Sequence, residues 1–467
     1  MATNTTMMTG NDLVSAFRKG EFEVDCIQMQ LAQNKSEKPV VYSGRGFIRL
    51  TEAGHLEFKI YADSVSNTTV LDSIKDLAAA ESGKIYDDTD FFTLNAIDLS
   101  RNNWSAENIL PRTHWPGPDA LPHIQGSIQI LRCTGGHFAN PRLKHFLRLH
   151  FFDEAEIPCP NTSVDQTPGG PTVKHDNAKF EVLGCEFLIT KSDAEIIVET
   201  QSDTPFAPYF EARVTEGLQF ILARSLSSQV LVRSDEGKQS LELSSAVPKA
   251  VRIKLDPPLA SGYQGYLEHS WQLFSLYVDY ITKANRGRYW HTCSYHLHNA
   301  CEASANSLDA WAVGVCVAVE GISSLVDVVE TDKEKKAKKD IAESLTEFID
   351  SQKWDVILTK RAKGLLGQLQ NLRVIDRLET LQAIGHVDAA HIKAWSKLRN
   401  KQAHPKHADL GSLRMDEIQG TLDLVSKTTV LMYHIVFHLI GYRGKYVDYG
   451  TYRYPVKDYP LESPPGT

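Results

Sequence analysis

The periodicity of the apolar residues changes near residue 258, and this change limits the fold more than any other feature of the chain. Up to that point apolar residues alternate with polar ones or form short β-rich runs, separated by clusters of Gly, Pro, Asn and Asp. The runs are residues 46–50, 55–61, 91–99, 126–133, 145–152, 180–189, 217–222 and 251–255. After residues 256–265 the apolar residues recur every three to four positions, as on one face of a helix. The sequence therefore predicts an α+β protein: a sandwich-like, β-rich first half followed by an all-helical region.

Helices are predicted throughout the second region because Gly and Pro nearly vanish from the interiors of its periodic segments. Thr331 and Glu334 have the spacing of a capping box, and Ser307 is positioned to cap the helix that follows it. The expected helices span residues 266–283, 289–305, 308–329, 333–351, 355–370, 373–383, 388–402 and 415–440.

Three regions follow from these patterns: residues 1–258, 259–440 and 441–467. Within the first, residues 157–173 contain four Pro and two Gly, which indicates a long loop or a seam between two β lobes. The last region has six Tyr with Gly and Pro and no helical period. It is expected to be an extended tail lying against the helical domain, with a stacking platform for bases as the alternative.

Composition excludes several classes of protein. The 467 residues include seven Cys without a CxxC pair, which argues against a disulfide scaffold or a zinc ribbon. The chain has no GxxxxGK[ST], no GxGxxG that opens a helix and no GxSxG, so nucleotide-loop and serine-hydrolase chemistry have no support. We expect a cytoplasmic protein with no membrane partner, because no signal-peptide pattern and no apolar run of about 18 residues occurs.

Charge is distributed unevenly along the chain. Eleven Lys and Arg and four Asp and Glu lie between residues 353 and 406, a local net charge of +7 in a chain whose net charge is −8. Such a basic island is consistent with local phosphate binding, and ordinary solvated helix faces can also produce it. The acidic chain as a whole is unsuited to wrapping nucleic acid.

The residues that suggest chemistry lie in KAWSKLRNKQAHPKHAD, residues 393–409. An imidazole such as that of His404 can accept or donate a proton near neutral pH, and the guanidinium of Arg399 presents a fork of donors that matches phosphate oxygens. Asn400 could orient either group. Because residues five apart are about 140° apart around a helix, and Pro405 disfavours helix at the residue before it, the helix is expected to end at or before His404. Without catalysis, both side chains could simply interact with the last carbonyls of the helix.

This motif and its position resemble the HEPN ribonucleases, helical domains whose signature is Arg, four to six residues, then His, often with a polar residue after the Arg. LRNKQAH matches that pattern at Arg399, Asn400 and His404, and Glu320 lies in an earlier helix where many members carry an acid. A β-rich region before such a domain, with a GEF...GFIRLTEAGHLEF start, also resembles the ApeA-type anti-phage abortive-infection proteins.

The resemblance implies a cytoplasmic homodimeric endoribonuclease that needs no metal or other cofactor and leaves 2′,3′-cyclic phosphate and 5′-OH ends. Arg399, His404 and Asn400 would be catalytic, and Lys397, Lys401 and Lys406 would bind RNA, such as tRNA or another RNA of translation. The β-rich half would be a sensor, a regulator or a specificity module, with a phage-derived trigger as its expected partner.

Other interpretations remain open. The main alternative is a non-catalytic HEPN-like dimer that binds nucleotide, RNA or a partner protein, and a third is a sugar- or peptide-binding β-sandwich that uses its helices only to dimerise. Residues 291–301 (HTCSYHLHNAC) contain residue types that ligate zinc, but their spacing matches no closed zinc motif known to us. His434 and His438 are four residues apart in an apolar helix, which favours packing over metal binding.

Overall fold

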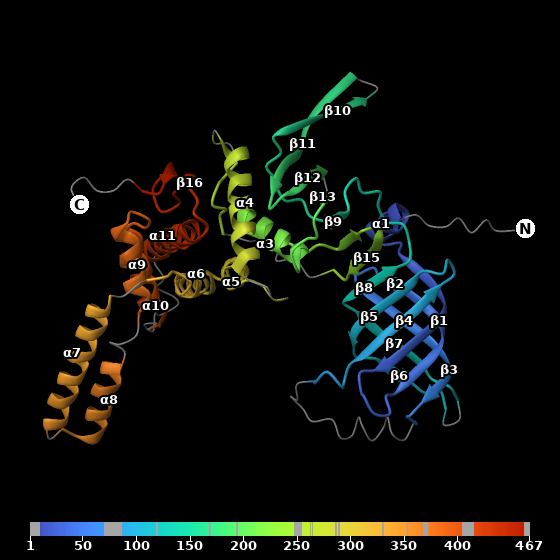
Figure 1. Cartoon of the computed structure of the whole chain (residues 1–467), viewed down its shortest axis with the longest axis horizontal. Coiled ribbons are helices and arrows are strands. Elements are labelled where there is room, and N and C mark those ends of the chain that lie inside the picture. The colour runs from blue at the N-terminus through green and yellow to red at the C-terminus, as the bar shows by residue number, and fades with distance from the viewer. Residues whose placement is uncertain are drawn as a thin grey trace, which may run out of the picture. The chain divides into compact units, whose positions relative to one another are not determined.

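The computed structural model describes residues 10–69, 86–117, 120–167, 170–192, 195–246, 255–261, 263, 265–284, 287, 290–328, 331–352, 354–367, 372–403 and 415–461. The chain forms two compact units (Figure 1). The first comprises Met1–Glu211 and Leu226–Lys249, and the second comprises Ala212–Ser225 and Ala250–Thr467. The expected α+β class is confirmed: one unit is built on a large antiparallel sheet and the other on helices.

The first unit is one hydrogen-bonded series of fifteen strands preceded by helix α1 (Gly10–Lys19). In chain order the strands are β1 (Glu23–Gln33), β2 (Val41–Leu50), β3 (Leu56–Ser66), β4 (Phe92–Asp98), β5 (Asn103–Ile109), β6 (Arg112–His114), β7 (His123–Ile128), β8 (Ile130–Thr134), β9 (His145–Phe151), β10 (Asn161–Thr167), β11 (Gly170–Val182), β12 (Cys185–Ser192), β13 (Glu195–Ser202), β14 (Val230–Asp235) and β15 (Lys238–Ser244).

Every neighbouring pair of strands in this sheet is antiparallel, in the order β10-β11-β12-β13-β9-β14-β15-β8-β5-β4-β1-β2-β3-β7-β6. The sheet curls so that β7 also approaches β5 (Figure 1). Alternate side chains, such as Met29 and Leu31 of β1 and Phe58 and Ile60 of β3, fill the enclosed core. Burial of these apolar faces sets the register of the strands, because a shift of one residue would turn each face outward.

Residues 157–173, expected to be a loop or a seam, instead contain β10 and the start of β11, which pair as a hairpin. The expectation of a long loop was wrong because Pro is tolerated at a sheet edge. Strand β10 is the outermost strand of the sheet, and Pro171 lies in a part of β11 that pairs with β10 but not with β12.

The second unit consists mainly of helices. They are α3 (Phe210–Leu222, of which all but the first two residues belong to this unit), α4 (Tyr266–Ala284), α5 (Thr292–Ser304), α6 (Leu308–Ser323), α7 (Asp332–Ser351), α8 (Val356–Gly367), α9 (Val374–Ala383), α10 (Ala389–Ala403) and α11 (Met415–Ile440). The eight from α4 onward correspond to the eight predicted. Helix α6 begins as expected, with the Ser307 hydroxyl accepting a hydrogen bond from the Ala310 amide at 3.1 Å. It ends at Ser323 and not at residue 329. At this end the hydroxyl of Ser323 donates to the Glu320 carbonyl, and that of Ser324 donates to the Gly321 carbonyl, one turn earlier in the helix.

Helix α3 corrects a second expectation, because residues 217–222 were predicted to be a strand. Gly217 lies where this helix crosses α4, and a Cβ there would be 2.5 Å from Cγ2 of Val278 and 2.8 Å from a ring carbon of Phe274. The glycine thus permits close helix packing and does not mark a turn between strands. Most of the predicted run 251–255 lies outside the described residues.

The Tyr-rich region after α11 forms a small hairpin of β16 (Gly444–Val447) and β17 (Val456–Tyr459). Four of its tyrosines are buried: Tyr442, Tyr446, Tyr449 and Tyr459. The rings of Tyr446 and Tyr459 contact His434 of α11, with centroid distances of 4.6 and 5.3 Å. Most of the aromatic surface of the tail is therefore used in packing on the helical unit, leaving Tyr452 and Tyr454 exposed.

Candidate functional site

Arg399 lies in the last turn and a half of α10, on the side of the helix that is not buried. The Asp388 carboxylate accepts a hydrogen bond from the Ala390 amide at 2.7 Å and so caps the start of the helix. The buried face of α10 comprises His391, Ile392, Ala394, Trp395 and Leu398. Because these side chains anchor the helix in the unit, the next positions, Arg399 and Asn400, are exposed.

The guanidinium of Arg399 forms an ion pair with Glu320 of α6. Nε of Arg399 donates to Oε1 of Glu320 at 2.5 Å, and the two side chains are 52% and 35% exposed. The two residues are 79 positions apart in sequence, and the packing of α10 on α6 brings them together. Gly321, the neighbour of Glu320, allows α6 to approach α5 closely, since a Cβ there would lie 2.0 Å from Nε2 of His296.

The remaining predicted residues are only partly placed. Asn400 and Lys397 are exposed on α10, whereas Nζ of Lys401 donates to Oγ1 of Thr421 in α11 at 2.6 Å. His404 and Lys406 lie outside the described residues, as does the rest of 404–414. The described part of the site is therefore the guanidinium, the carboxylate that holds it, the amide of Asn400 and the two lysines.

This arrangement can bind an anion. Glu320 engages Nε of Arg399, and the described residues offer the guanidinium no further hydrogen-bond partner, so its two terminal nitrogens are available to a phosphate. Holding Nε fixes the plane of the guanidinium, which lowers the entropy lost when it grips a ligand. The described residues of this site include no imidazole, so proton transfer here would depend on His404.

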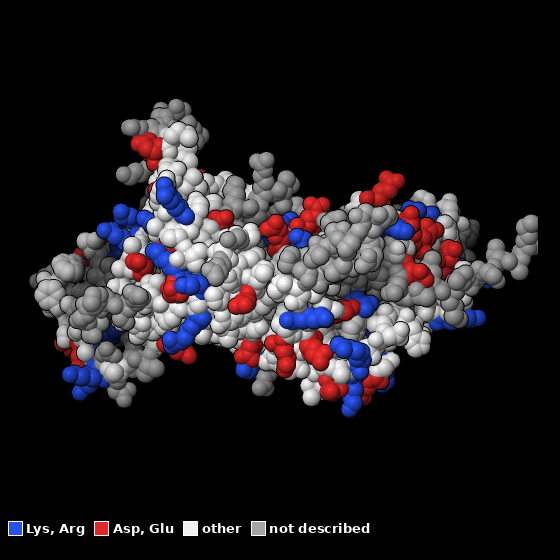
Figure 2. Space-filling model, turned by 90° about the horizontal axis from the view of Figure 1, so that it is seen from above, with Lys and Arg blue, Asp and Glu red and all other residues white. Residues whose placement is uncertain are grey.

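Charged groups of both signs lie on one face of the molecule. In the view of Figure 2, Lys and Arg are interspersed with Asp and Glu and with wide uncharged areas. A continuous cationic surface is not seen on this face. Because the net charge of the chain is −8, binding of a polyanion at Arg399 would depend on the local set of cations and not on a field that covers the molecule.

The histidines and cysteines of residues 291–301 are used in packing. Nδ1 of His291 accepts from the Cys293 amide at 3.1 Å and caps α5, and burial followed by the nearby Arg213 charge lowers the pKa of His291 to about 4. The thiol of Cys301 donates to the Ala223 carbonyl at 3.2 Å. Burial raises the pKa of Cys293 and of Cys301 to about 12, so neither is poised as a thiolate ligand or nucleophile. Among the described residues, no group of three or more His, Cys, Asp or Glu is placed to hold a metal ion.

His434 and His438 also pack within the second unit. His434 is fully buried between α10 and the tail hairpin, and burial holds its pKa well below the usual value. Nδ1 of His438 lies 3.0 Å from Nδ1 of His386, which in turn is 3.0 Å from the Tyr459 hydroxyl. These contacts link the tail hairpin to α11 and account for His438 without a ligand. His434 is held by ring packing, and among the described residues neither of its ring nitrogens has a hydrogen-bond partner.

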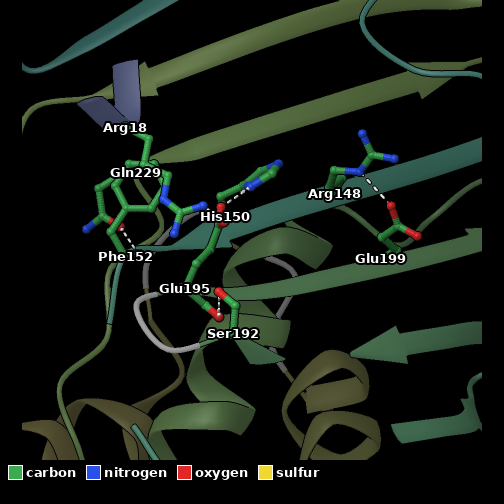
Figure 3. Close-up of polar contacts among 8 residues, drawn as sticks. All are labelled: Arg18, Arg148, His150, Phe152, Ser192, Glu195, Glu199 and Gln229. Carbon is green, nitrogen blue, oxygen red and sulfur yellow. Dashed lines mark hydrogen bonds and ion pairs between the residues drawn. The ribbon is translucent and has the colours of Figure 1, made fainter. Parts of the chain in front are cut away.

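A polar cluster in the first unit was not predicted from the sequence. Nδ1 of His150 in β9 lies 2.6 Å from Oε1 of Glu195 in β13, and Nη1 of Arg18 in α1 is 2.8 Å from the other carboxylate oxygen (Figure 3). Burial raises the pKa of Glu195, but the hydrogen bond and charge of His150 and the charge of Arg18 outweigh it and leave the pKa lowered. His150 and Glu195 are 8% and 7% exposed, so this pair is buried, whereas the Arg18 side chain is 43% exposed.

The sequence signal for this cluster was present but weak. His150 lies between the buried, apolar Leu149 and Phe151 of β9, and Glu195 begins β13 immediately before the buried Ile196. A polar group at such a position needs a partner, yet nothing in the local sequence identifies a residue 45 positions away.

The outer face of the sheet carries a hollow of about 290 Å³ over β1, β4, β5 and β8. Its lining is rich in uncharged polar side chains: Gln28, Gln30, Asn95, Asn103, Ser105 and Thr134. Strand register places Gln30, Asn95 and Ser105 in one row, and Asn103 beside Thr134 in the next. Rows of amides and hydroxyls present hydrogen-bond donors and acceptors without net charge, which suits a neutral polar ligand.

None of the helices in the described part of the chain combines the length and the apolar character needed to cross a membrane. Comparison of the chain with protein-family models, with curated proteins and with solved structures finds no match.

Proposed function

We propose that this protein is a metal-independent endoribonuclease of the HEPN type, with Arg399, His404 and Asn400 as its catalytic residues. The observation that carries the proposal is the exposed guanidinium of Arg399, fixed through Nε by Glu320 of a neighbouring helix and beside an exposed Asn400. A guanidinium oriented in this way, whose terminal nitrogens have no hydrogen-bond partner among the described residues, is suited to the charge that develops on a phosphorane. The motif resemblance supplies the imidazole, His404.

In this proposal RNA provides its own nucleophile, the 2′-OH. His404 transfers a proton at the attacking 2′ oxygen or at the leaving 5′ oxygen, and Arg399 stabilises the charge on the non-bridging phosphate oxygens. Asn400 orients the phosphate or the imidazole. Attack by the adjacent 2′ oxygen forms one P–O bond and breaks the bond to the 5′ oxygen, so the products carry a 2′,3′-cyclic phosphate and a 5′-OH.

The proposal extends to a homodimer and to regulation in anti-phage defence. Val313 and Val317 are 45% and 50% exposed and lie two turns and one turn, respectively, before Glu320 on α6, so an apolar strip lies beside the Arg399 pair. A second subunit seated there would bring a second Arg399 and His404 into one groove. The uncharged hollow on the sheet of the first unit is the place we assign to the sensed ligand.

Incubation of the purified protein with end-labelled RNA in EDTA tests the activity. We expect cleavage with cyclic-phosphate ends, and a loss of about 10²-fold or more in rate for Arg399→Ala and for His404→Ala. Arg373→Ala is the matched control, because Arg373 is also exposed and also paired with a carboxylate, that of Asp376, on a different helix. It should retain nearly full activity.

Each contrary result has a distinct meaning. RNA binding without cleavage by the unmodified chain, over a range of RNAs that includes tRNA, would favour the non-catalytic binding dimer. Equal losses in the Arg373 and Arg399 variants would show that Arg399 contributes only general positive charge.

A further inference from the structure

The arginines in the strands of the first unit differ in whether a carboxylate pairs with them. Four of the six form ion pairs with a glutamate: Arg49 with Glu57, Arg132 with Glu242, Arg148 with Glu199 and Arg233 with Glu211. Arg45 of β2 and Arg112 of β6 are exposed and have no carboxylate partner among the described residues. The charges of the other four are neutralised by their partners, whereas these two are available to an anion.

The register of the strands places these two arginines on one outer surface. Residues directly opposite each other in paired strands have their side chains on the same face of the sheet. One row across β2, β3, β7 and β6 consists of Arg45, Tyr61, His123 and His114, and the next row consists of Phe47, Lys59, Gln125 and Arg112. The alternate residues, such as Phe58 and Ile60, face the core, so both rows face outward. We call these eight residues the basic face.

Two aromatic side chains lie between the cations of the basic face. The ring of Tyr61 is 54% exposed, and Nζ of Lys59 lies 5.0 Å from its centroid. Phe47 is partly exposed, and the guanidinium carbon of Arg49 lies 5.2 Å from its ring centroid. Exposed aromatic rings beside cations are the groups with which proteins bind single-stranded nucleic acid, because the ring stacks on a base while the cations contact the phosphates.

The dimensions of the basic face favour a ligand with several negative charges. Strands lie about 4.8 Å apart, so a row of four residues extends over about 14 Å, and the two rows are about 7 Å apart along the strands. Arg45 and Arg112 occupy diagonally opposite corners of this area. They are too far apart to bind the same small anion, so only an extended polyanion can use both guanidinium groups together with the ring between them.

We propose that the basic face binds single-stranded RNA, with a base stacked on Tyr61 and phosphates held by the cations of the two rows. The two imidazoles and the amide of Gln125 add donors and acceptors that can bind the 2′-OH of ribose. The choice of RNA over DNA rests on the proposed ribonuclease function, for which the basic face is a second RNA-binding surface of the same chain.

The carboxylates near the basic face argue against other polyanions. On β1, β2, β3, β6 and β7 they are Glu23, Asp25, Glu57 and Asp63, and all four lie outside the two rows. An anionic membrane would approach the whole surface and would meet these carboxylates as well as the cations. A duplex keeps its bases stacked inside and could not use Tyr61. A short single strand can follow the cations of the rows and avoid the carboxylates.

Fluorescence anisotropy of a labelled single-stranded RNA tests the role of the two arginines. Every variant carries Arg399→Ala, so that neither cleavage nor binding at the other site contributes. Arg45→Gln with Arg112→Gln should weaken binding at least about tenfold and reduce the slope of log affinity against log salt by about 1.4, because each phosphate contact with a single strand contributes about 0.7. Arg132→Gln with Arg142→Gln is the matched control, since it removes the same formal charge from exposed ion pairs elsewhere on this unit. It should change the affinity less than about twofold.

Substitution of Tyr61 tests stacking. Tyr61→Ala should weaken binding about tenfold, whereas Tyr61→Phe keeps the ring and should bind nearly as well as the parent. Ultraviolet cross-linking of RNA that contains 4-thiouridine, followed by mass spectrometry, should place the cross-link in β3. Circular dichroism and a thermal melt confirm folding of each variant.

Several outcomes would overturn the inference. Equal losses of affinity in the test and control double variants would show that only the net charge acts. Unchanged binding by Tyr61→Ala would remove the stacking role, and single-stranded DNA of the same sequence that binds as tightly as the RNA would remove the choice of RNA. Because these experiments measure binding with Arg399 replaced, a failure of the ribonuclease proposal, seen as no cleavage by the unmodified chain, leaves their results unchanged.

Discussion

Each unit of this protein contains a carboxylate paired with a cation from a distant element, and the two pairs differ in burial. In the first unit, Glu195 lies between His150 and Arg18 and is 7% exposed. In the second, Glu320 and Arg399 are 35% and 52% exposed. The residue types are similar, yet in the first unit the carboxylate is buried, whereas in the second a ligand from solution can reach both members of the pair.

The comparison separates a structural role from a binding role. A buried carboxylate that loses its partners still carries a large desolvation penalty. Its pairing with those partners therefore stabilises the fold and has a structural role. An exposed pair contributes little to stability because water solvates both groups nearly as well when they are apart. The formal charges and the residue types alone would not distinguish the two clusters; the exposure of the carboxylate does.

The largest expected effect is a loss of stability when one member of the buried His150–Glu195 pair is removed. His150→Ala leaves one oxygen of the buried Glu195 carboxylate without its hydrogen-bond partner while Arg18 still pairs the other, and should lower the free energy of unfolding of the first unit by about 1–3 kcal/mol. Glu320→Ala, the matched change at the exposed pair, should cost about 0–1 kcal/mol in the second unit. Urea denaturation followed by hydrogen exchange in β9 and α10 measures both. Equal losses of unfolding free energy in the two variants would show that burial does not separate a structural pair from a binding pair.

The helices of the second unit could be predicted because local signals agreed. The start of α6 had both an apolar period and a capping residue, Ser307, and tertiary packing had no reason to override them. Helix α3 could not be predicted in the same way. Its Gly217 permits close packing against Val278, a residue 61 positions later. From the sequence alone, a glycine beside a short apolar run indicates the end of a strand.

The candidate site was predicted in part for a similar reason. Arg399 and Asn400 lie within one short motif, so their proximity follows from the helix itself. The acid at Glu320 was noticed through the family resemblance, but its contact with Arg399 depends on how α6 and α10 pack. His150 and Glu195 offered no motif, and only the pairing of β9 with β13 brings them together.

The next effect is on the pH dependence of stability. Burial lowers the pKa of His291, His391 and His434 in the second unit. In the unfolded chain the same histidines have a pKa of about 6.5. Below pH 6.5 the unfolded state therefore binds more protons, and the free energy of unfolding of this unit should fall by about 1–2 kcal/mol per fully buried histidine between pH 7 and pH 5. The raised pKa of Glu216 and of Asp256 offsets part of this loss, since both gain protons in the folded state.

The first unit should respond at lower pH. The lowered pKa of Glu195 makes its contribution complete above pH 4.5, the ordinary value, and that contribution is lost as the pH falls through the lowered folded pKa. Segment-resolved hydrogen exchange at pH 7, 6 and 5 should therefore show α11 weakening before β9. His434→Leu should reduce the pH dependence of α11 over this range. Simultaneous weakening of both units would contradict the assignment.

The smallest effect concerns the exchange of partners at the exposed pair. Glu320→Gln removes the charge that competes with phosphate for Arg399 while keeping a group that can still accept the hydrogen bond from Nε. RNA affinity should rise about two- to fivefold, with a steeper dependence on salt because one more cation is free to displace counterions. Cleavage should change less than binding, since the amide still orients the guanidinium. The control is Glu320→Gln in the Arg399→Ala background, where affinity and salt slope should not respond. If affinity rises equally in that background, Glu320 acts on RNA by general repulsion, and its contact with Arg399 has no part in binding.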